Sequence, residues 1–187
     1  MRKQNITMTL KDYYNQEIKK KLMFDLKIGN IMAVPKVVKI VVNVGAGEAI
    51  TSKGVLDKIK EQIAIITGQN PVITRARISV SAFKLRKGAP IGIKVTLRGK
   101  KMDSFLEKLI KVIIPRLRDF RGIAEKTIDQ HGNLSIGFSE QTIFPEIEFD
   151  KIDKIRGLEV TIVTNARSQE HGKKLFELLG IPFKKSS

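Results

Sequence analysis

The strongest constraint on the fold is a period of two in the apolar residues of two segments. Residues 36–45 read KVVKIVVNVG, which puts Val38, Ile40, Val42 and Val44 on one side and Lys39, Val41 and Asn43 on the other. Residues 91–98 likewise separate Ile91, Ile93, Val95 and Leu97 from Gly92, Lys94, Thr96 and Arg98. Such alternation predicts β-strands with one buried face. If the apolar sets pack on helices, the polar and cationic sets lie on the opposite face of the sheet.

Apolar residues recur at helical spacing in four further segments. This spacing predicts helices over about 9–22, 53–67, 102–114 and 168–179, of which the third ends at Pro115. Further strands are predicted in LSIGFS and LEVTIVTN, and a hairpin within 71–98 whose turn lies in RKGAPIG. We therefore predict a single α+β domain over residues 1–187, with helices on one face of a largely antiparallel sheet and the other face open.

Charge is concentrated in the first half of the chain. Residues 1–101 hold 21 basic and 6 acidic side chains, whereas 102–187 hold 14 and 13, and the whole chain carries a formal charge of +16. The 41 residues between Glu61 and Asp103 contain nine cations and no acid. Residues 138–153 are locally acidic. Uncompensated charge of this density opposes compaction, so it indicates a polyanionic partner, most simply a nucleic acid.

Several kinds of chemistry are excluded or poorly supported. The chain has no cysteine, which excludes disulfides, thiolate metal sites and cysteine nucleophiles. Gly45–Gly47 stands where a dinucleotide fingerprint would begin, but Ile50 replaces its third glycine and no acidic residue follows near Ile73. His131 and His171 lack the spacing of zinc ligands.

The acidic residues do not form a recognisable site either. Glu140, Glu146, Glu148 and Asp150 could pair or bind a hard cation, but the spacing of a calcium loop is missing. We therefore expect no enzymatic activity, no cofactor and no metal site. No stretch approaches 18 uninterrupted apolar residues, so no membrane partner is expected.

The kind of nucleic acid follows from the scarcity of aromatic side chains. The chain has no tryptophan, and the acid-free stretch holds one aromatic residue, Phe83, so a platform for stacking single-stranded bases is poorly supplied. Lysine, arginine and small polar side chains favour contacts with phosphates, sugar hydroxyls and folded shape. Folded RNA is the preferred partner. The same charge permits an architectural binder of duplex DNA, and a nucleotide-using enzyme is the third alternative.

Several long runs resemble one known family. They are VPKVVKIVVNVGAGEA, ITGQNPVITRARISVSAFKLRKGAPIGIKVTLRG, PRLRDFRG, SEQTIFPEI and IRGLEVTIVT. Together they resemble the bacterial-type ribosomal protein five of the large subunit, the 5S ribosomal RNA-binding protein of the central protuberance, from about Tyr13 to Phe183. The resemblance implies a ribosome-bound, cytoplasmic structural protein without homo-oligomers. A bacterial and an organellar ribosome are both compatible with it.

The resemblance also implies partners and contact residues. The partners are 5S and 23S ribosomal RNA, P-site transfer RNA and a protein in the head of the small subunit. The expected ribosomal RNA contacts are Lys39, Asn43, Gly45, Gly68, Gln69, Asn70, Thr74, Lys94, Thr96 and Arg98. The expected transfer RNA contacts, around the loop 76–87, are Arg75, Arg77, Ser79, Ser81, Lys84, Arg86 and Lys87. The expected inter-subunit bridge is made by Arg116, Arg118, Gly137, Glu140 and Glu146.

Overall fold

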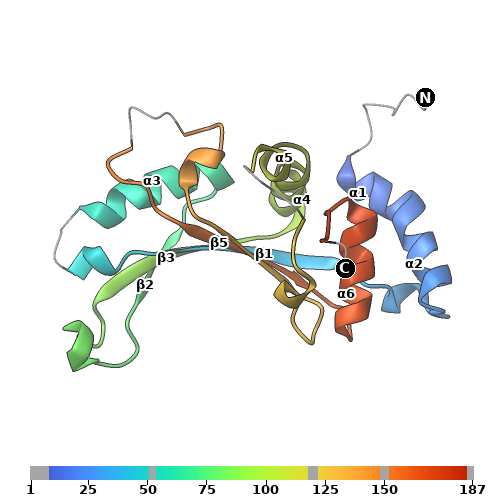
Figure 1. Ribbon diagram of the computed structural model, residues 1–187, viewed down its shortest axis with the longest axis horizontal. Coiled ribbons are helices and arrows are strands. Elements are labelled where there is room, and N and C mark those ends of the chain that lie inside the picture. The colour runs from blue at the N-terminus through green and yellow to red at the C-terminus, as the bar shows by residue number, and fades with distance from the viewer. Residues whose placement is uncertain (1–8, 51–53, 118–121, 148–151, 185–187) are drawn as a thin grey trace. The chain divides into compact units, whose positions relative to one another are not determined.

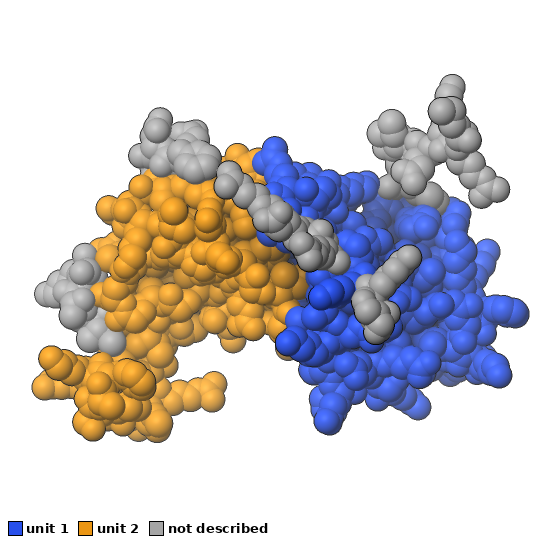
Figure 2. All heavy atoms as spheres, in the orientation of Figure 1, with its two compact units in different colours: residues 1–38, 102–134, 162–187 blue, residues 39–101, 135–161 orange. Residues whose placement is uncertain are grey.

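The computed structural model describes residues 9–50, 54–117, 122–147 and 152–184, and the chain divides into two compact units. Unit 1 comprises residues 1–38, 102–134 and 162–187, and unit 2 comprises 39–101 and 135–161 (Figure 2). Unit 2 holds most of the sheet and all of the predicted ribosomal and transfer RNA contacts.

Five strands form one sheet in the order β2-β3-β1-β5-β4 (Figure 1). Their bounds are β1 Val37–Gly45, β2 Val72–Arg75, β3 Pro90–Leu97, β4 Leu134–Phe138 and β5 Leu158–Thr164. Strand β3 pairs antiparallel with both β1 and β2. Together with the helices, this sheet confirms the predicted α+β class.

The alternation in β1 and β3 has the predicted consequence. Ile40, Val42 and Val44 of β1 and Ile93, Val95 and Leu97 of β3 are each at most 3% exposed. The alternate residues Lys39, Asn43, Lys94 and Thr96 are exposed or partly exposed, whereas Gly92 of the same set is buried. Val38 departs from the pattern, because 38% of it is exposed at the start of the strand.

Helix α3, Val55–Thr67, covers the apolar face of β3 and β2 within unit 2 (Figure 1). Its buried residues Leu56, Ile59, Ile63 and Ile66 recur at helical spacing. The helix ends at Gly68, whose φ of 64° permits the left-handed cap in which its N–H donates to the carbonyl of Ala64. The predicted helix over 53–67 is thus confirmed, and its first described turn begins at Val55.

The predicted hairpin is confirmed, but only the first part of the predicted turn RKGAPIG lies in its connection. The connection between β2 and β3 runs over residues 76–89 and β3 begins at Pro90, so Pro90 belongs to the strand, and Gly92 lies in β3 as the predicted strand 91–98 also places it. Gly92 lies opposite Thr74 of β2 and Gly45 of β1, so it is a strand glycine. The glycine and proline residues of RKGAPIG therefore belong to two different elements. Gly88 lies at the end of the loop, and Pro90 and Gly92 lie at the start of β3.

Three helical segments belong mainly to unit 1. The first runs through α1 Leu10–Tyr13, η1 Tyr14–Ile18 and α2 Lys19–Asp25, which extends the predicted helix by three residues. The second runs through α4 Gly99–Lys108, η5 Leu109–Ile113 and α5 Ile114–Arg116, so the helix continues past Pro115 to Arg116. The third, α6 Gln169–Leu179, begins after the capping side chain of Ser168 and ends at Gly180, as predicted. It packs against η1.

Candidate nucleic-acid interface

On the exposed face of the sheet in unit 2, the register between β1 and β3 determines which side chains lie next to each other. Asn43 lies directly opposite Lys94, and Val41 lies opposite Thr96. These four residues alternate with the buried set that faces α3, so their side chains lie on the other face of the sheet. We call this face of β2, β3, β1, β5 and β4 the open face. It presents an amide, an ammonium group and a hydroxyl to solvent.

A row of small residues crosses the open face. Thr74, Gly92 and Gly45 are register partners on β2, β3 and β1. A Cβ at Gly92 would lie 2.7 Å from the carbonyl oxygen of Val44 and 3.0 Å from Oγ1 of Thr74, so no larger residue fits there. Gly45 is exposed, and a Cβ added to it would have no heavy atom within 4 Å. Gly92 therefore serves close packing of the strands, whereas Gly45 leaves room for a partner's backbone to approach the sheet closely.

The turn after α3 is held at the Thr96 end of β3. Nε2 of Gln69 donates to the carbonyl oxygen of Thr96 at 3.1 Å, and Nζ of Lys101 donates to the carbonyl oxygen of Gly68 at 2.7 Å. Gly68 and Asn70 are exposed on either side of Gln69. The side-chain amide of Gln69 is therefore engaged with the protein, while its neighbours face solvent.

Two further cations continue the same alternation. Lys39 is partly exposed two residues before Val41 in β1, and Arg98 is exposed two residues after Thr96. The structure therefore brings Lys39, Asn43, Gly45, Thr74, Lys94 and Thr96 onto one face of the sheet. Gln69 adjoins this face through Thr96, and Arg98 follows directly after β3.

The open face also extends over residues that the sequence analysis did not assign to it. Leu158 of β5 lines a pocket together with Val44 and Ile63, so it lies on the α3 side, and Glu159 and Thr161 lie on the other. Oγ of Ser135 in β4 is 3.0 Å from Oγ1 of Thr161. Gly137, two residues on from Ser135, is exposed. The alternation in LEVTIVT was the signal that could have placed Glu159 and Thr161.

The loop 76–89 between β2 and β3 forms a hydrogen-bonded arm, coloured green in Figure 1. Ala76 and Gly88 are joined at its base, Val80 and Leu85 form a β-bridge, and the backbone N–H of Lys87 donates to Oγ of Ser79. Its exposed side chains include Arg77, Ser81, Lys84, Arg86 and Lys87. Six of the seven predicted transfer RNA contacts are therefore together on one arm, and the seventh, Arg75, is the last residue of β2.

Two features of this arm were not anticipated. Nη1 of Arg75 donates to the carbonyl oxygen of Gly88 at 3.0 Å, so this guanidinium is used in part to close the arm. Ile78 and Phe83 are 69% and 75% exposed among the cations. The arm thus offers apolar surface as well as charge.

The predicted bridge residues are divided between the two units. Arg116 is exposed at the end of α5 in unit 1, whereas Gly137, Glu140 and Glu146 belong to unit 2. Oε2 of Glu140 accepts a hydrogen bond from Oγ1 of Thr142 at 2.9 Å. Arg118 lies outside the described residues. The assignment of these residues to an inter-subunit bridge therefore stays a prediction.

Among the described residues, no group of three or more His, Cys, Asp or Glu side chains could hold a metal ion. None of the helices in that part of the chain is long and apolar enough to cross a membrane.

Comparison with known proteins identifies the family of the chain. A family model described as "Ribosomal protein L5" matches residues 30–86, and a second one, for the C-terminus of the same ribosomal family, matches residues 90–183. The chain belongs to the ribosomal protein L5 family. The boundary between the two L5 matches falls at the end of the 76–89 arm, so β1 and β2 lie in one match and β3 begins the other.

Relatives within the L5 family match over almost the whole chain. The chain is 54% identical over 175 residues to "Large ribosomal subunit protein uL5" of Geotalea uraniireducens and of Citrifermentans bemidjiense, covering 94% of this chain and 98% of each relative. It is 52% identical over 177 residues to the protein of the same name from Synechococcus sp., covering 95% and 99%. These matches confirm the resemblance and identify a ribosomal protein, not an enzyme.

Proposed function

We propose that this L5 family protein is a structural component of the large ribosomal subunit that attaches 5S ribosomal RNA through the open face of unit 2. The single observation that carries the proposal is the register of Asn43 opposite Lys94 on a face that no apolar residue of the buried set reaches. An amide and an ammonium group side by side can bind a phosphate and an adjoining sugar hydroxyl or base edge. The ribosomal RNA contacts are the ten residues of the sequence analysis.

Three properties support folded RNA over duplex DNA as the partner. The open face carries small residues and includes the exposed Gly45, where an added Cβ would meet no heavy atom within 4 Å, which suits close approach to a sugar-phosphate backbone with its 2′-hydroxyls. The hydroxyl of Thr96 can contact ribose, and those of Ser135 and Thr161, which share one hydrogen bond, can each accept a further one. The relatives are named as proteins of the large ribosomal subunit, which is built on RNA.

The arm 76–89 contacts P-site transfer RNA in this proposal. It carries exposed cations on a scaffold that is joined by backbone hydrogen bonds. Contacts with 23S ribosomal RNA complete the attachment to the central protuberance.

The bridge to a small-subunit head protein involves Arg116, Arg118, Gly137, Glu140 and Glu146. The acidic region 138–153, which includes Glu140 and Glu146, suits a basic protein neighbour better than RNA. The protein acts on the ribosome in the cytoplasm.

The test is a salt series of binding to labelled 5S ribosomal RNA, transfer RNA and random duplex DNA. Binding to 5S RNA should weaken steeply with salt, because each phosphate contact adds about 0.7 to 0.9 to the slope of log K against log salt. At physiological salt, 5S RNA should bind at least tenfold more tightly than either competitor. Equal affinity for the three nucleic acids would overturn specific 5S attachment, and a preference for the duplex would favour the DNA-binding alternative.

A further inference from the structure

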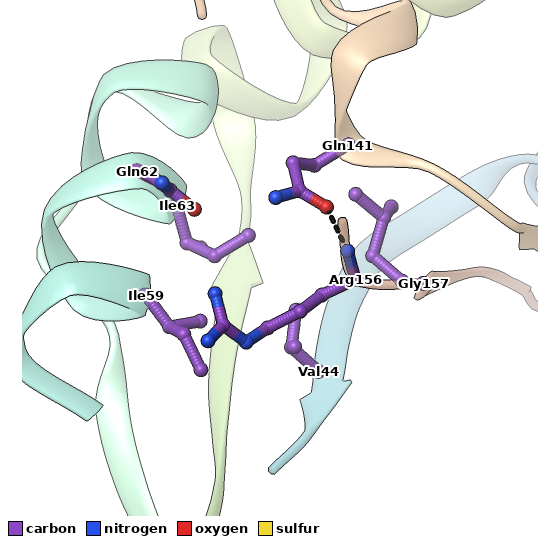
Figure 3. A pocket seen from close by; sticks show the side chains of 8 residues that line it. Val44, Ile59, Gln62, Ile63, Gln141, Arg156 and Gly157 are labelled. Carbon is purple, nitrogen blue, oxygen red and sulfur yellow. Dashed lines mark hydrogen bonds between the residues drawn. The ribbon is translucent and has the colours of Figure 1, made fainter. Parts of the chain in front are cut away.

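Arg156 is the most extensively bonded buried side chain described in unit 2. Its side chain is 8% exposed. Nε donates to Oε1 of Glu48 at 2.7 Å, and Nη1 and Nη2 donate to the two carboxylate oxygens of Asp153 at 2.8 and 3.1 Å. The backbone N–H of Arg156 donates to Oε1 of Gln141 (Figure 3). A guanidinium is suited to this role because its planar fork binds two acceptors at once.

Neighbouring charges extend these contacts into a network that joins three parts of unit 2. Nζ of Lys154 donates to Oε2 of Glu48 at 2.7 Å, and Nζ of Lys58 in α3 lies 3.9 Å from Oδ2 of Asp153. Nε2 of Gln141 donates to the carbonyl oxygen of Lys154 at 2.7 Å. The network therefore connects the 3-10 turn Gly47–Ile50, helix α3 and the segment that precedes β5.

The carboxylates of this network are held in their ionised form. The hydrogen bonds from Arg156 lower the pKa of Asp153 to about 2, and those from Lys154 and Arg156 lower the pKa of Glu48. Both acids therefore remain charged at neutral pH and retain Arg156 as a partner.

The guanidinium lies directly behind the end of β1. It lines a small pocket with Val44 of β1 and with Ile59 and Ile63 of α3, on the covered face of the sheet (Figure 3). Val44 stands between Asn43 and Gly45, whose exposed backbone belongs to the open face. Glu48 follows Gly45 by three residues. Arg156 thus holds the chain just behind and just after two proposed RNA contacts without lying on the RNA side.

We propose that Arg156 is a positioning residue for RNA binding, which fixes the end of β1 and the Gly45–Gly47 turn through Glu48. The proposal rests on the proposed attachment of RNA to the open face. Backbone hydrogen bonds also hold this turn, from Ala46 to the carbonyl of Ile91 and from Ala49 to that of Ala46. Arg156 and Lys154 add a link from Glu48, next to this turn, to the segment that precedes β5. A fully bonded buried network favours one arrangement of the groups it joins.

The test replaces Arg156 by methionine, which has similar length but no charge, and measures binding to 5S ribosomal RNA across a salt series. The variant should bind about tenfold more weakly because Glu48 and the turn lose their fixed position. Its salt slope should equal that of the wild type, because no phosphate contact is removed. Arg156→Lys should recover part of the affinity, since it can keep one charged hydrogen bond.

The matched control is Lys173→Met in unit 1. Nζ of Lys173 binds Oε1 of Glu125 at 2.6 Å, so this change also breaks an ion pair and removes one positive charge. It should lower the midpoint of urea unfolding while leaving the affinity for 5S RNA unchanged. Equal losses of affinity in both variants would mean that charge or stability alone explains the effect, and would overturn a positioning role.

A second variant tests the proposal if Arg156→Met does not fold. Glu48→Ala removes the tether at its other end and adds one positive charge to the molecule, which by itself strengthens RNA binding. We expect a loss of about fivefold instead. Wild-type affinity in a folded Arg156→Met or Glu48→Ala variant, or a slope changed by about one, would overturn the proposal. Failure of the wild type to prefer 5S RNA would instead overturn the proposed function.

Discussion

Asn43 of β1 and Lys94 of β3 are register partners in an antiparallel pair, and both side chains lie on the face of the sheet opposite α3. Directly opposed residues in such a pair have Cβ atoms about 4.5 to 5.5 Å apart. An amide that can donate and accept therefore stands beside a fixed positive charge. This pairing is the centre of the proposed RNA-binding face.

Reversing the charge of Arg98 should weaken RNA binding without disturbing the fold. Arg98 is exposed, and the buried residues of β3 keep their partners in Arg98→Glu. We expect the affinity for 5S RNA to fall about tenfold or more, and the salt slope to decrease by about 0.7 to 0.9. Lys60→Glu on α3 makes the same change in net charge away from the open face. Normal binding by Arg98→Glu, or equal losses in both variants, would contradict the assignment of this face.

Alanine at Gly92 should destabilise the protein. The added Cβ would lie 2.7 Å from the carbonyl oxygen of Val44, which is backbone and cannot move aside freely. Overpacking of this kind costs about 1–3 kcal/mol. The free energy of unfolding from urea denaturation measures the loss, and an unchanged value would show that the strands separate easily there.

Alanine at Gly45 should leave the stability of the protein nearly unchanged but weaken its binding to RNA. Its added Cβ would have no heavy atom within 4 Å, so the free energy of unfolding should change by less than about 0.5 kcal/mol. Binding to 5S RNA should nevertheless weaken, because the methyl group would stand where the RNA backbone approaches. Full RNA affinity in Gly45→Ala would remove this glycine from the interface.

Substitutions in the arm 76–89 should weaken the binding of transfer RNA but not that of 5S RNA. Arg77→Glu or Arg86→Glu should leave the affinity for isolated 5S RNA unchanged, because these side chains are exposed on the arm and not on the sheet. In assembled ribosomes, the same variants should weaken P-site transfer RNA binding. Normal transfer RNA binding by both variants would exclude the arm from that contact.

Acid should weaken the Arg156 network over a defined range of pH. Because the pKa of Asp153 is lowered to about 2 from an unfolded value of about 3.9, its contribution to stability is present above about pH 4 and is lost as the pH falls toward 2. The difference in urea midpoint between wild type and Asp153→Asn should therefore shrink over this range. A difference that stays constant would contradict the assignment of the shift to Asp153.

We predict that the chain is a single domain, although its contacts divide it into two compact units. If both units unfold together, calorimetry will show one transition whose calorimetric and van't Hoff enthalpies agree. Two transitions would assign each unit its own stability.

Local pattern was enough to predict the strands and their faces, but not contacts between distant segments. The alternation in β1 and β3 fixed which residues are buried, because successive side chains of a strand point to opposite faces. The hairpin connection is longer than predicted and ends before Pro90, and the close packing of Gly92 against Thr74 and Val44 was not predicted, because these residues are far from it in sequence. The Arg156 network was missed for the same reason, since Glu48 is 108 residues away.

The most direct test of RNA binding to the open face is hydroxyl-radical footprinting of the protein with and without 5S ribosomal RNA. Val72 lies opposite Lys94 on that face and is 69% exposed, whereas Ile65 on α3 is 49% exposed. We predict that saturating 5S RNA protects Val72 from oxidation and leaves Ile65 unchanged. Protection of Ile65 with continued oxidation of Val72 would contradict the account, because the RNA would then bind the helical side.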